Sequence, residues 1–402
     1  MFTVEAKQQF SNLLEKSITK LDLTDAQFEA ITERYRAVGE WLGGEDSPLA
    51  KYYPDIKPQG SLRLGTVTRP WLRDDEFDLD FTFKLQIPKV SITQYGLKHM
   101  VGNRLKDERS RYKDMLGKEK RRCWTINYSD ETKFHMDIVP SIPDDFTWLL
   151  AIGVPYEIAK HAVCITDNEK WNNGDDWPKS NPEGYALWFL DKMKTRHLLL
   201  EASMRKSMQV DKVPEHKIKT PLQRSIQLLK RHRDSVFGND KDKPASIIIT
   251  TLAAYAYNNE ENLYDAMSSI LSKMDDPTYL RIENGLYVIE NPVSPSSNGY
   301  PGENFADKWN EKPGKATNFF VWLETARSYF KSFSDMRDMP LMAKSLKSVI
   351  GERYVNESLN EIATAQKEMR EGGLLKMAAG TGILGTEGRA PVSNHNFHGI
   401  DE

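Results

Sequence analysis

The most informative part of the chain is residues 77–83, which read Phe77-Asp78-Leu79-Asp80-Phe81-Thr82-Phe83. Apolar residues occupy every second position, a period that predicts a strand with one face in a core and the other open. Because side chains at i and i+2 of a strand point the same way, Asp78 and Asp80 stand side by side. Two such carboxylates raise each other's pKa unless a cation lies between them, and Mg²⁺ prefers oxygen ligands of this kind. The stretch therefore predicts a strand that offers a cation site.

A second alternating stretch, Phe134-His135-Met136-Asp137-Ile138-Val139, places Asp137 on the face that it shares with His135. We expect this strand to lie beside the first and to direct Asp137 toward Asp78 and Asp80. Three carboxylates on one face are costly without compensating charge, which two divalent cations would supply. An isolated Asp-x-Asp would instead indicate a solvated strand face, and Asp137 moves the balance toward a metal site only modestly.

A glycine-serine pair, Gly60-Ser61, follows Gln59 and lies 17 residues before Asp78, after an extended segment and ahead of a short helical turn. Glycine lets the backbone approach a ligand closely, and a helix N-terminus presents unpaired amides to phosphate. Most Gly-Ser pairs are ordinary turns. This pair points to phosphate binding only in combination with the carboxylates downstream.

The length and composition bound the class of protein. A chain of 402 residues is long enough for two lobes, and its net charge of −3 argues against non-specific coating of nucleic acid. The basic runs at residues 118–122 and 230–233 could still bind phosphates within one site. Cys123 and Cys164 are expected to be reduced structural thiols. No apolar run has the length of a membrane helix and the start does not resemble a signal peptide, so we expect a cytoplasmic protein without a membrane partner.

The order of predicted elements indicates an α+β fold in which strands precede a helical part. We expect a lobe with a mixed central sheet and N-terminal helices over residues 1–145, an irregular crossing over 146–182, a helical lobe over 183–371 and a flexible tail over 372–402. Helical periodicity predicts helices at residues 5–17, 24–43, 97–117, 183–204, 222–237, 245–257, 261–274, 315–333, 340–349 and 352–369.

Gly60-Ser61, Asp78-x-Asp80 and Asp137 together resemble the polymerase-beta-like nucleotidyltransferase superfamily. Its pattern is a Gly-Ser on the first strand-helix turn, an acidic pair on the next strand and a third acidic residue on a later strand. The resemblance implies that Gln59, Gly60 and Ser61 hold a nucleoside triphosphate. It also implies that the three aspartates are catalytic and bind two Mg²⁺ ions, for which Mn²⁺ can substitute.

Two residues of the helical part narrow the resemblance to the CD-NTase family, the relatives of cGAS and DncV, with an oligoadenylate-synthetase-like helical lobe. Lys230 lies late on one helix and Ser246 at the start of the next, and the family implies that both bind the donor triphosphate. Taken without the resemblance, the basic helix end would complement the helix dipole and Ser246 would be a simple cap.

The resemblance implies a synthase that joins nucleoside triphosphates into a cyclic di- or trinucleotide second messenger, such as cyclic GMP-AMP, and releases pyrophosphate. ATP is expected as a substrate and GTP is a candidate. The implied setting is CBASS-type anti-phage defence, with an effector protein encoded nearby and no template nucleic acid. In some such systems the C-terminus is conjugated to a target, but this chain ends in Asp401-Glu402 rather than in a small residue.

Two other functions stay open at this point. One is a template-independent or single-transfer nucleotidyltransferase that acts on RNA or a small molecule. The other is a catalytically dead nucleotide-binding scaffold, which the presence of all three aspartates disfavours. The residues leave the bases and the linkage of a product undetermined.

Overall fold

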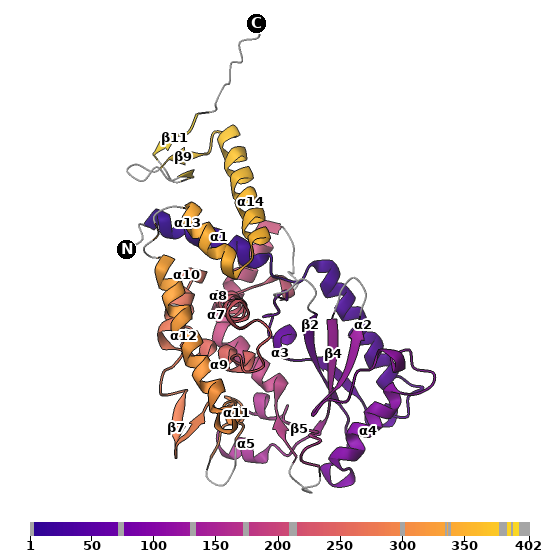
Figure 1. Ribbon diagram of the computed structural model, residues 1–402. Coiled ribbons are helices and arrows are strands. Elements are labelled where there is room, and N and C mark those ends of the chain that lie inside the picture. Colours follow the sequence, from indigo (N-terminus) through magenta and orange to yellow (C-terminus); the bar gives the residue numbers. More distant parts are fainter. Residues whose placement is uncertain are drawn as a thin grey trace.

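The computed structural model describes residues 4–70, 76–128, 134–171, 177–208, 215–297, 302–333, 336, 339–377, 384–386 and 389–393. A lobe that contains the large sheet lies beside a lobe built of helices, as Figure 1 shows. The α+β class and the mixed sheet are therefore confirmed. None of the helices in the described ranges is both long and apolar enough to cross a membrane.

The large sheet has the strand order β1-β2-β4-β5-β6, and β3 pairs with β4 beside this path. β2 and β4 run parallel, whereas the other pairs are antiparallel. Both predicted carboxylate strands are present, and β4 extends beyond the expected end at residue 139. The strands are β1 (Asp55–Pro58), β2 (Phe77–Lys84), β3 (Trp124–Tyr128), β4 (Phe134–Pro143), β5 (Val163–Ile165) and β6 (Lys179–Ser180).

Alternating apolar residues bury one face of this sheet. Leu79, Phe81 and Ile138 are fully buried and pack with apolar residues of α2 (Asp25–Gly43) and α4 (Gln94–Leu105). In Figure 1 these two helices lie on the side of the sheet away from the helical lobe. The face that carries the aspartates is consequently turned toward the helical lobe.

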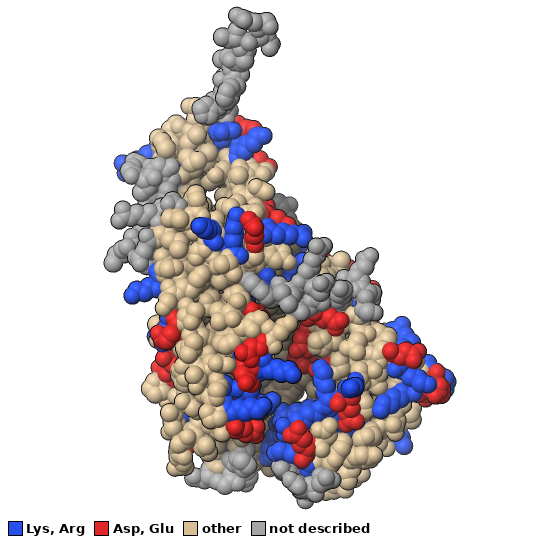
Figure 2. All heavy atoms as spheres, viewed as in Figure 1, with Lys and Arg blue, Asp and Glu red and all other residues tan. Residues whose placement is uncertain are grey.

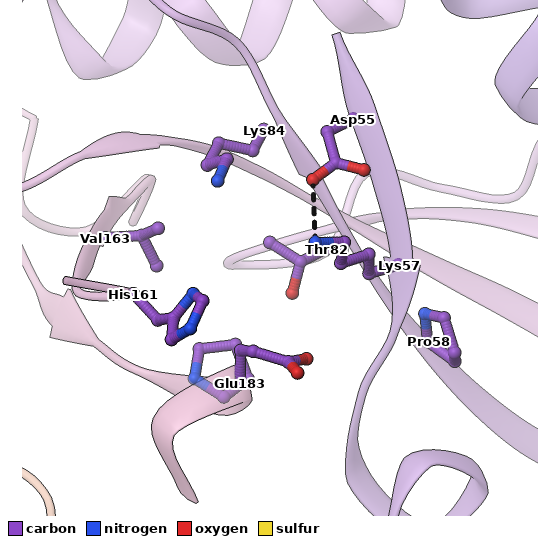
Figure 3. Close-up of a pocket in the computed structure, with 9 residues that line it drawn as sticks. Asp55, Lys57, Pro58, Thr82, Lys84, His161, Val163 and Glu183 are labelled. Atoms are coloured by element: carbon purple, nitrogen blue, oxygen red, sulfur yellow. Dashed lines mark ion pairs between the residues drawn. The ribbon is translucent and has the colours of Figure 1, made fainter. Parts of the chain in front are cut away.

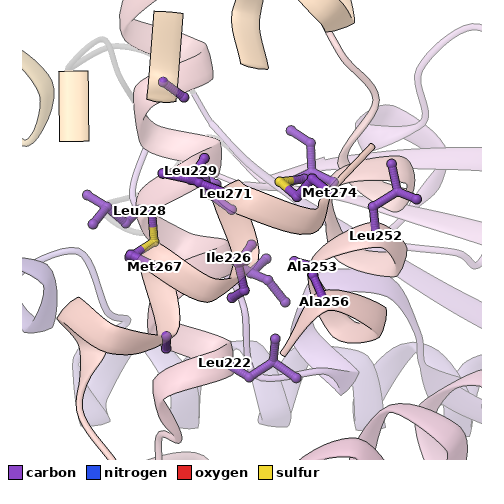
Figure 4. Close-up of a cluster of buried hydrophobic side chains, with 14 of the residues drawn as sticks. Leu222, Ile226, Leu228, Leu229, Leu252, Ala253, Ala256, Met267, Leu271 and Met274 are labelled. Atoms are coloured by element: carbon purple, nitrogen blue, oxygen red, sulfur yellow. The ribbon is translucent and has the colours of Figure 1, made fainter. Parts of the chain in front are cut away.

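The helical lobe is organised around α8, whose predicted apolar stripe at Leu222, Ile226 and Leu229 packs against neighbouring helices (Figure 4). Every helix predicted after residue 182 is present. A short hairpin, β7 (Arg281–Glu283) and β8 (Leu286–Val288), also belongs to this part of the chain. The helices are α7 (Pro182–Met208), α8 (Pro221–Phe237), α9 (Ser246–Ala256), α10 (Leu263–Lys273), α11 (Asp307–Glu311), α12 (Pro313–Phe333), α13 (Met339–Val349) and α14 (Glu352–Glu371).

Three expectations need correction. The helix expected over residues 97–117 ends at Leu105, because Asp107 Oδ1 accepts a hydrogen bond from the Arg109 amide at 3.0 Å and turns the chain. The segment 146–182 is less irregular than expected, since it contains α5 (Thr147–Ala151), α6 (Tyr156–Ala159) and strands β5 and β6. Helix α1 (Val4–Thr19) was expected with the sheet, but Phe10 and Leu13 are buried in the helical lobe.

The described part of residues 372–402 includes three short strands, of which the central one, β9 (Lys376–Met377), pairs with both β10 (Leu384–Gly385) and β11 (Ala390–Pro391). Residues 378–383, 387–388 and 394–402 lie outside the described residues, and with them the last two acidic residues. Cys123 and Cys164 are free and buried, as expected for structural thiols.

Candidate active site

Three carboxylates converge on the sheet face that is turned toward the helical lobe. The parallel register of β2 and β4 places Asp80 opposite Asp137 and Asp78 opposite His135. One oxygen from each of the three aspartates lies within 4.8 Å of the others. Asp78 is exposed, Asp80 is half-buried and Asp137 is buried. The structure therefore assembles the predicted acidic triad from two strands that are separated by about fifty residues of sequence.

The charge of this cluster is only partly compensated by the protein. Burial, together with the charges of Asp78 and Asp137, raises the pKa of Asp80 to about 7. A hydrogen bond from His135 lowers the pKa of Asp78. The three groups form an all-oxygen donor set, which fits a hard divalent cation such as Mg²⁺ or Mn²⁺.

Two cationic side chains contact the triad, and their roles were not predicted from the sequence. Lys120 Nζ lies 2.9 and 3.0 Å from the two carboxylate oxygens of Asp137, and Thr125 Oγ1 donates a hydrogen bond of 2.5 Å to the same carboxylate. His135 Nε2 lies 3.0 Å from Asp78 Oδ1, and this contact raises the pKa of His135. Burial is the largest single influence on Lys120 and lowers its pKa, but the hydrogen bond to Asp137 and the nearby negative charges together outweigh burial and raise the pKa of Lys120. Lys120 belongs to the basic run noted in the sequence.

The glycine-serine turn lies directly beside the triad. α3 (Gly60–Arg63) follows β1, and the Gln59 amide donates to the Asp80 carbonyl at 2.9 Å. Gln59 Oε1 accepts a hydrogen bond from Thr82 Oγ1 at 2.5 Å. Gly60 has a φ of +56°, and a Cβ atom there would lie 2.8 Å from Asp80 Oδ2. The position therefore requires glycine both for its backbone conformation and for its closeness to the carboxylate.

Lys230 reaches the same turn from the helical lobe. Its Nζ donates to the carbonyl and to Oγ1 of Thr66, at 3.2 Å each, and the Thr66 amide donates to the Ser61 carbonyl at 2.9 Å. Burial, followed by the nearby charge of Arg233, lowers the pKa of Lys230 to about 7. The structure thus connects Lys230 to Ser61 through one residue.

Ser246 is the exposed first residue of α9, and the cap position is occupied by Ala245. The interpretation of Ser246 as a helix cap is therefore wrong. Ser246 Oγ accepts a hydrogen bond of 2.8 Å from Nη1 of Arg233, one turn after Lys230 on α8. Arg233 was not among the site residues predicted from the sequence. Its bond to Ser246 adds it to the two residues, Lys230 and Ser246, that the resemblance assigned to the donor nucleotide.

The polar sheet face continues past the triad into a small pocket of about 40 Å³ (Figure 3). Thr82 and Lys84 on β2 line this pocket, and His161 and Glu183 face them from the other side. On a larger scale, Figure 2 shows basic and acidic side chains gathered around the hollow between the two lobes. The region around the triad is therefore polar, accessible and bordered by both lobes.

Comparison with protein families identifies the sheet-containing lobe. Residues 54–140, which include the Gly-Ser turn and all three aspartates, match the family described as cyclic GMP-AMP synthase DncV-like, nucleotidyltransferase domain.

Two characterised relatives extend the similarity over nearly the whole chain. A c-di-GMP synthase from Roseivirga ehrenbergii is 28% identical over 401 residues, covering 99% of this chain and 100% of the relative. The cyclic dinucleotide synthase CdnG from Bradyrhizobium diazoefficiens is 24% identical over 393 residues, covering 90% and 87%.

The solved structures show the same fold. The structure of the Bradyrhizobium diazoefficiens CD-NTase CdnG in complex with GTP has a TM-score of 0.65 and 20% identity, over 88% of this chain and 99% of that chain. The Escherichia coli CdnC chain of a complex with HORMA has a TM-score of 0.54 and 15% identity, over 85% and 96%. The fold, the acidic triad and the matched domain agree: residues 54–140 match a DncV-like nucleotidyltransferase domain, and the chain is similar to CD-NTases over nearly its whole length.

Proposed function

We propose that this protein is a cyclic dinucleotide synthase that uses nucleoside triphosphates, GTP among them, and releases pyrophosphate. The observation that carries the proposal is the convergence of Asp78, Asp80 and Asp137 within 4.8 Å, directly beside the Gly60-Ser61 turn. The full-length relative from Roseivirga ehrenbergii is named a c-di-GMP synthase, which supports GTP as a substrate.

The triphosphate of the donor nucleotide is proposed to lie between the turn and the helical lobe. Gln59, Gly60 and Ser61 would approach it from the sheet side, and Lys230 and Ser246 from the side of α8 and α9. The nearness of Lys230 to the turn supports this arrangement, since a single intervening residue separates its Nζ from the backbone of Ser61. The pKa of Lys230 is about 7, and the negative charge of a phosphate placed beside its Nζ would favour the protonated form of the lysine.

The three aspartates are proposed to hold two Mg²⁺ ions, which in such sites lower the pKa of an attacking hydroxyl and offset charge on the leaving group. The acceptor ribose hydroxyl attacks the α-phosphorus, a new P–O bond forms, and the bond to the pyrophosphate oxygen breaks. Asp137 is the proposed acceptor of the hydroxyl proton. Its contacts with Thr125 and Lys120 fix the orientation of the carboxylate.

A product of this kind is proposed to serve as a second messenger that activates a separate effector protein, in a setting of the CBASS type. The support for this step is the family alone.

The test is to incubate the purified protein with all four nucleoside triphosphates and Mg²⁺, and to identify products by mass spectrometry. We expect a phosphatase-resistant cyclic dinucleotide that contains guanine, and its absence when both Asp78 and Asp80 are replaced by asparagine. A linear oligomer, or a nucleotide transferred only to an added RNA or small molecule, would refute cyclisation. Product formation by the double variant would refute the metal assignment.

A further inference from the structure

The segment that follows the Gly60-Ser61 turn is held by side chains at or just before α8. Their amide, ammonium and guanidinium groups donate to the backbone carbonyls of residues 64–67, 69 and 70. The bonds run from Gln223 to Leu64 at 3.0 Å, Lys219 to Gly65 at 2.5 Å, Lys230 to Thr66 at 3.2 Å, Gln227 to Val67 at 2.7 Å, and Arg231 to Arg69 at 3.2 Å and to Pro70 at 2.9 Å.

The amides of the same segment fold back onto the turn itself. The Leu64 amide donates to the Gly60 carbonyl at 3.0 Å, and the Thr66 amide donates to the Ser61 carbonyl at 2.9 Å. The carbonyls of residues 64–67 thus accept hydrogen bonds from side chains of α8 and of Lys219 just before it, whereas the amides of Leu64 and Thr66 donate to Gly60 and Ser61. Any displacement of the segment relative to α8 is therefore transmitted to the turn.

Packing alone does not hold the turn, because a cavity of about 740 Å³ lies against it between α2 and α7. Leu62 and Leu64 border this cavity from the turn, and Lys219 and Gln223 border it from the helical lobe. The segment is packed in part, since Thr66 is fully buried and Leu64 and Val67 belong to the apolar clusters of the two lobes. Where the cavity removes such close contacts, hydrogen bonds to the carbonyls add a restraint on the position of the segment.

The side-chain amides of Gln223 and Gln227 are engaged within the protein, because the nitrogen and the oxygen of each form hydrogen bonds to other residues of the chain. Gln223 is 5% exposed and Gln227 is fully buried. Gln223 Oε1 accepts from the Thr220 amide at 2.8 Å and completes the capping box of α8. Gln227 Nε2 donates to Asp22 Oδ1 at 2.8 Å as well as to Val67, and its Oε1 accepts from Arg224 at 3.0 Å.

We propose that Gln223 and Gln227 are positioning residues that hold the Gly60-Ser61 turn in place for the donor triphosphate. The inference rests on the proposed function of the turn. A Lys230 that turns toward phosphate weakens its bonds to Thr66, and the two glutamines keep the carbonyls of Leu64 and Val67 fixed. The position of Ser61 then does not depend on whether Lys230 is occupied.

Two substitutions and a matched control separate this role from a structural one. Gln223→Glu keeps the helix cap, because glutamate is an equivalent third residue of a capping box, but it removes the N–H donor to the Leu64 carbonyl. Gln227→Met removes the donor to Val67. Gln94→Met is the matched control for the methionine variant, since Gln94 is 2% exposed and its Oε1 accepts from the Asp167 amide at 2.9 Å, away from the turn.

The experiment measures kcat and KM for GTP with Mg²⁺, together with the melting temperature and hydrogen exchange of residues 60–70. We expect Gln223→Glu and Gln227→Met to raise KM about tenfold, to change kcat less, and to speed amide exchange at Ser61 and Thr66. Gln94→Met is expected to lower the melting temperature similarly with KM within twofold of the wild type. Gln227→Met added to Ser61→Ala is expected to raise KM no further than Ser61→Ala alone.

The inference is overturned if Gln223→Glu, Gln227→Met and Gln94→Met raise KM equally, or if amide exchange over residues 60–70 is unchanged in both Gln223→Glu and Gln227→Met. If Gln223→Glu does not fold, Gln227→Met against Gln94→Met decides alone. Absence of any nucleotide turnover by the wild type would refute the proposed function instead, and the exchange measurement would still decide whether the glutamines hold the turn.

Discussion

Replacing Asp80 by asparagine is expected to stabilise the metal-free protein while it abolishes catalysis. Burial and the charges of Asp78 and Asp137 raise the pKa of Asp80 from 3.8 to about 7, so the ionised carboxylate is unfavourable in the folded state. The amide keeps the shape of the side chain and removes its charge. The ionised Asp80 carboxylate lowers the stability of the metal-free fold, and a metal-binding role accounts for an aspartate at this position.

The size and sign of this effect follow from the two pKa values. A carboxyl group with a raised pKa in the folded state contributes stability that is fully present below about pH 4 and is lost as the pH rises through about 7. Above pH 7 the loss corresponds to an upper limit of about 4 kcal/mol, since one pKa unit is 1.36 kcal/mol. Relaxation around a half-buried side chain reduces it, so we expect about 2 kcal/mol and a rise in melting temperature of a few degrees.

The assay is thermal unfolding of both proteins in EDTA at pH 6 and pH 8, repeated with Mg²⁺. The advantage of Asp80→Asn over the wild type should grow from pH 6 to pH 8. Added Mg²⁺ should stabilise only the wild type, because a ligand that binds the folded state alone stabilises it by mass action. Asp55→Asn is the control, as Asp55 lies on the adjacent strand and pairs with Lys57 at 3.1 Å. The reasoning fails if Asp80→Asn melts at or below the wild-type temperature at pH 8 in EDTA.

Three further predictions concern single residues around the triad. Gly60→Ala is expected to reduce product formation at least 100-fold, because its Cβ would lie 2.8 Å from Asp80 Oδ2. The control Gly238→Ala, with a φ of +51° and no atom within 4 Å of its Cβ, should remain active. Equal losses of product formation in the two variants would contradict the prediction. Wild-type KM for GTP should rise between pH 6 and pH 8 as Lys230 loses its proton near pH 7, and Lys230→Met should show a higher KM without that pH dependence. Lys120→Met should lower the Mg²⁺ concentration needed for half-maximal activity, since Lys120 competes for Asp137; a higher requirement in a Mg²⁺ titration would show that Lys120 assists metal binding.

The parts of the site that lie in one strand or one turn could be predicted from the sequence. Alternation in residues 77–83 and 134–139 predicts both strands, and the parallel register then brings Asp80 and Asp137 together. The contact of Lys120 with Asp137 could not be predicted. It depends on the antiparallel register of β3, which sets Thr125 opposite Asp137 and so carries the preceding basic run toward the triad. A run of charges carries no information about the strand against which it will lie.

Long-range packing also explains where the prediction of the fold from the sequence was wrong. The apolar stripe of α1 is compatible with either lobe, and only the surfaces left uncovered by the later helices decide that Phe10 and Leu13 join the helical core. Strand β5 has three residues, too few for a periodic pattern, and it forms because the second half of β4 offers a free edge between residues 141 and 143.

The polar side of α8 shows a more general limit of sequence patterns. Amphipathic spacing predicts that residues outside the stripe of Leu222, Ile226 and Leu229 face solvent, yet Gln223 and Gln227 are buried. The two glutamines are buried because their side chains bond to backbone carbonyls. Every residue has a backbone carbonyl, so the sequence of residues 64–67 does not reveal which carbonyls will accept these bonds. An amide side chain can be buried only where its hydrogen bonds are satisfied. A helix that buries amide side chains at a spacing of four, outside its apolar stripe, is thus a sign that a second piece of main chain lies against it. In this protein that piece is the segment adjoining the Gly60-Ser61 turn.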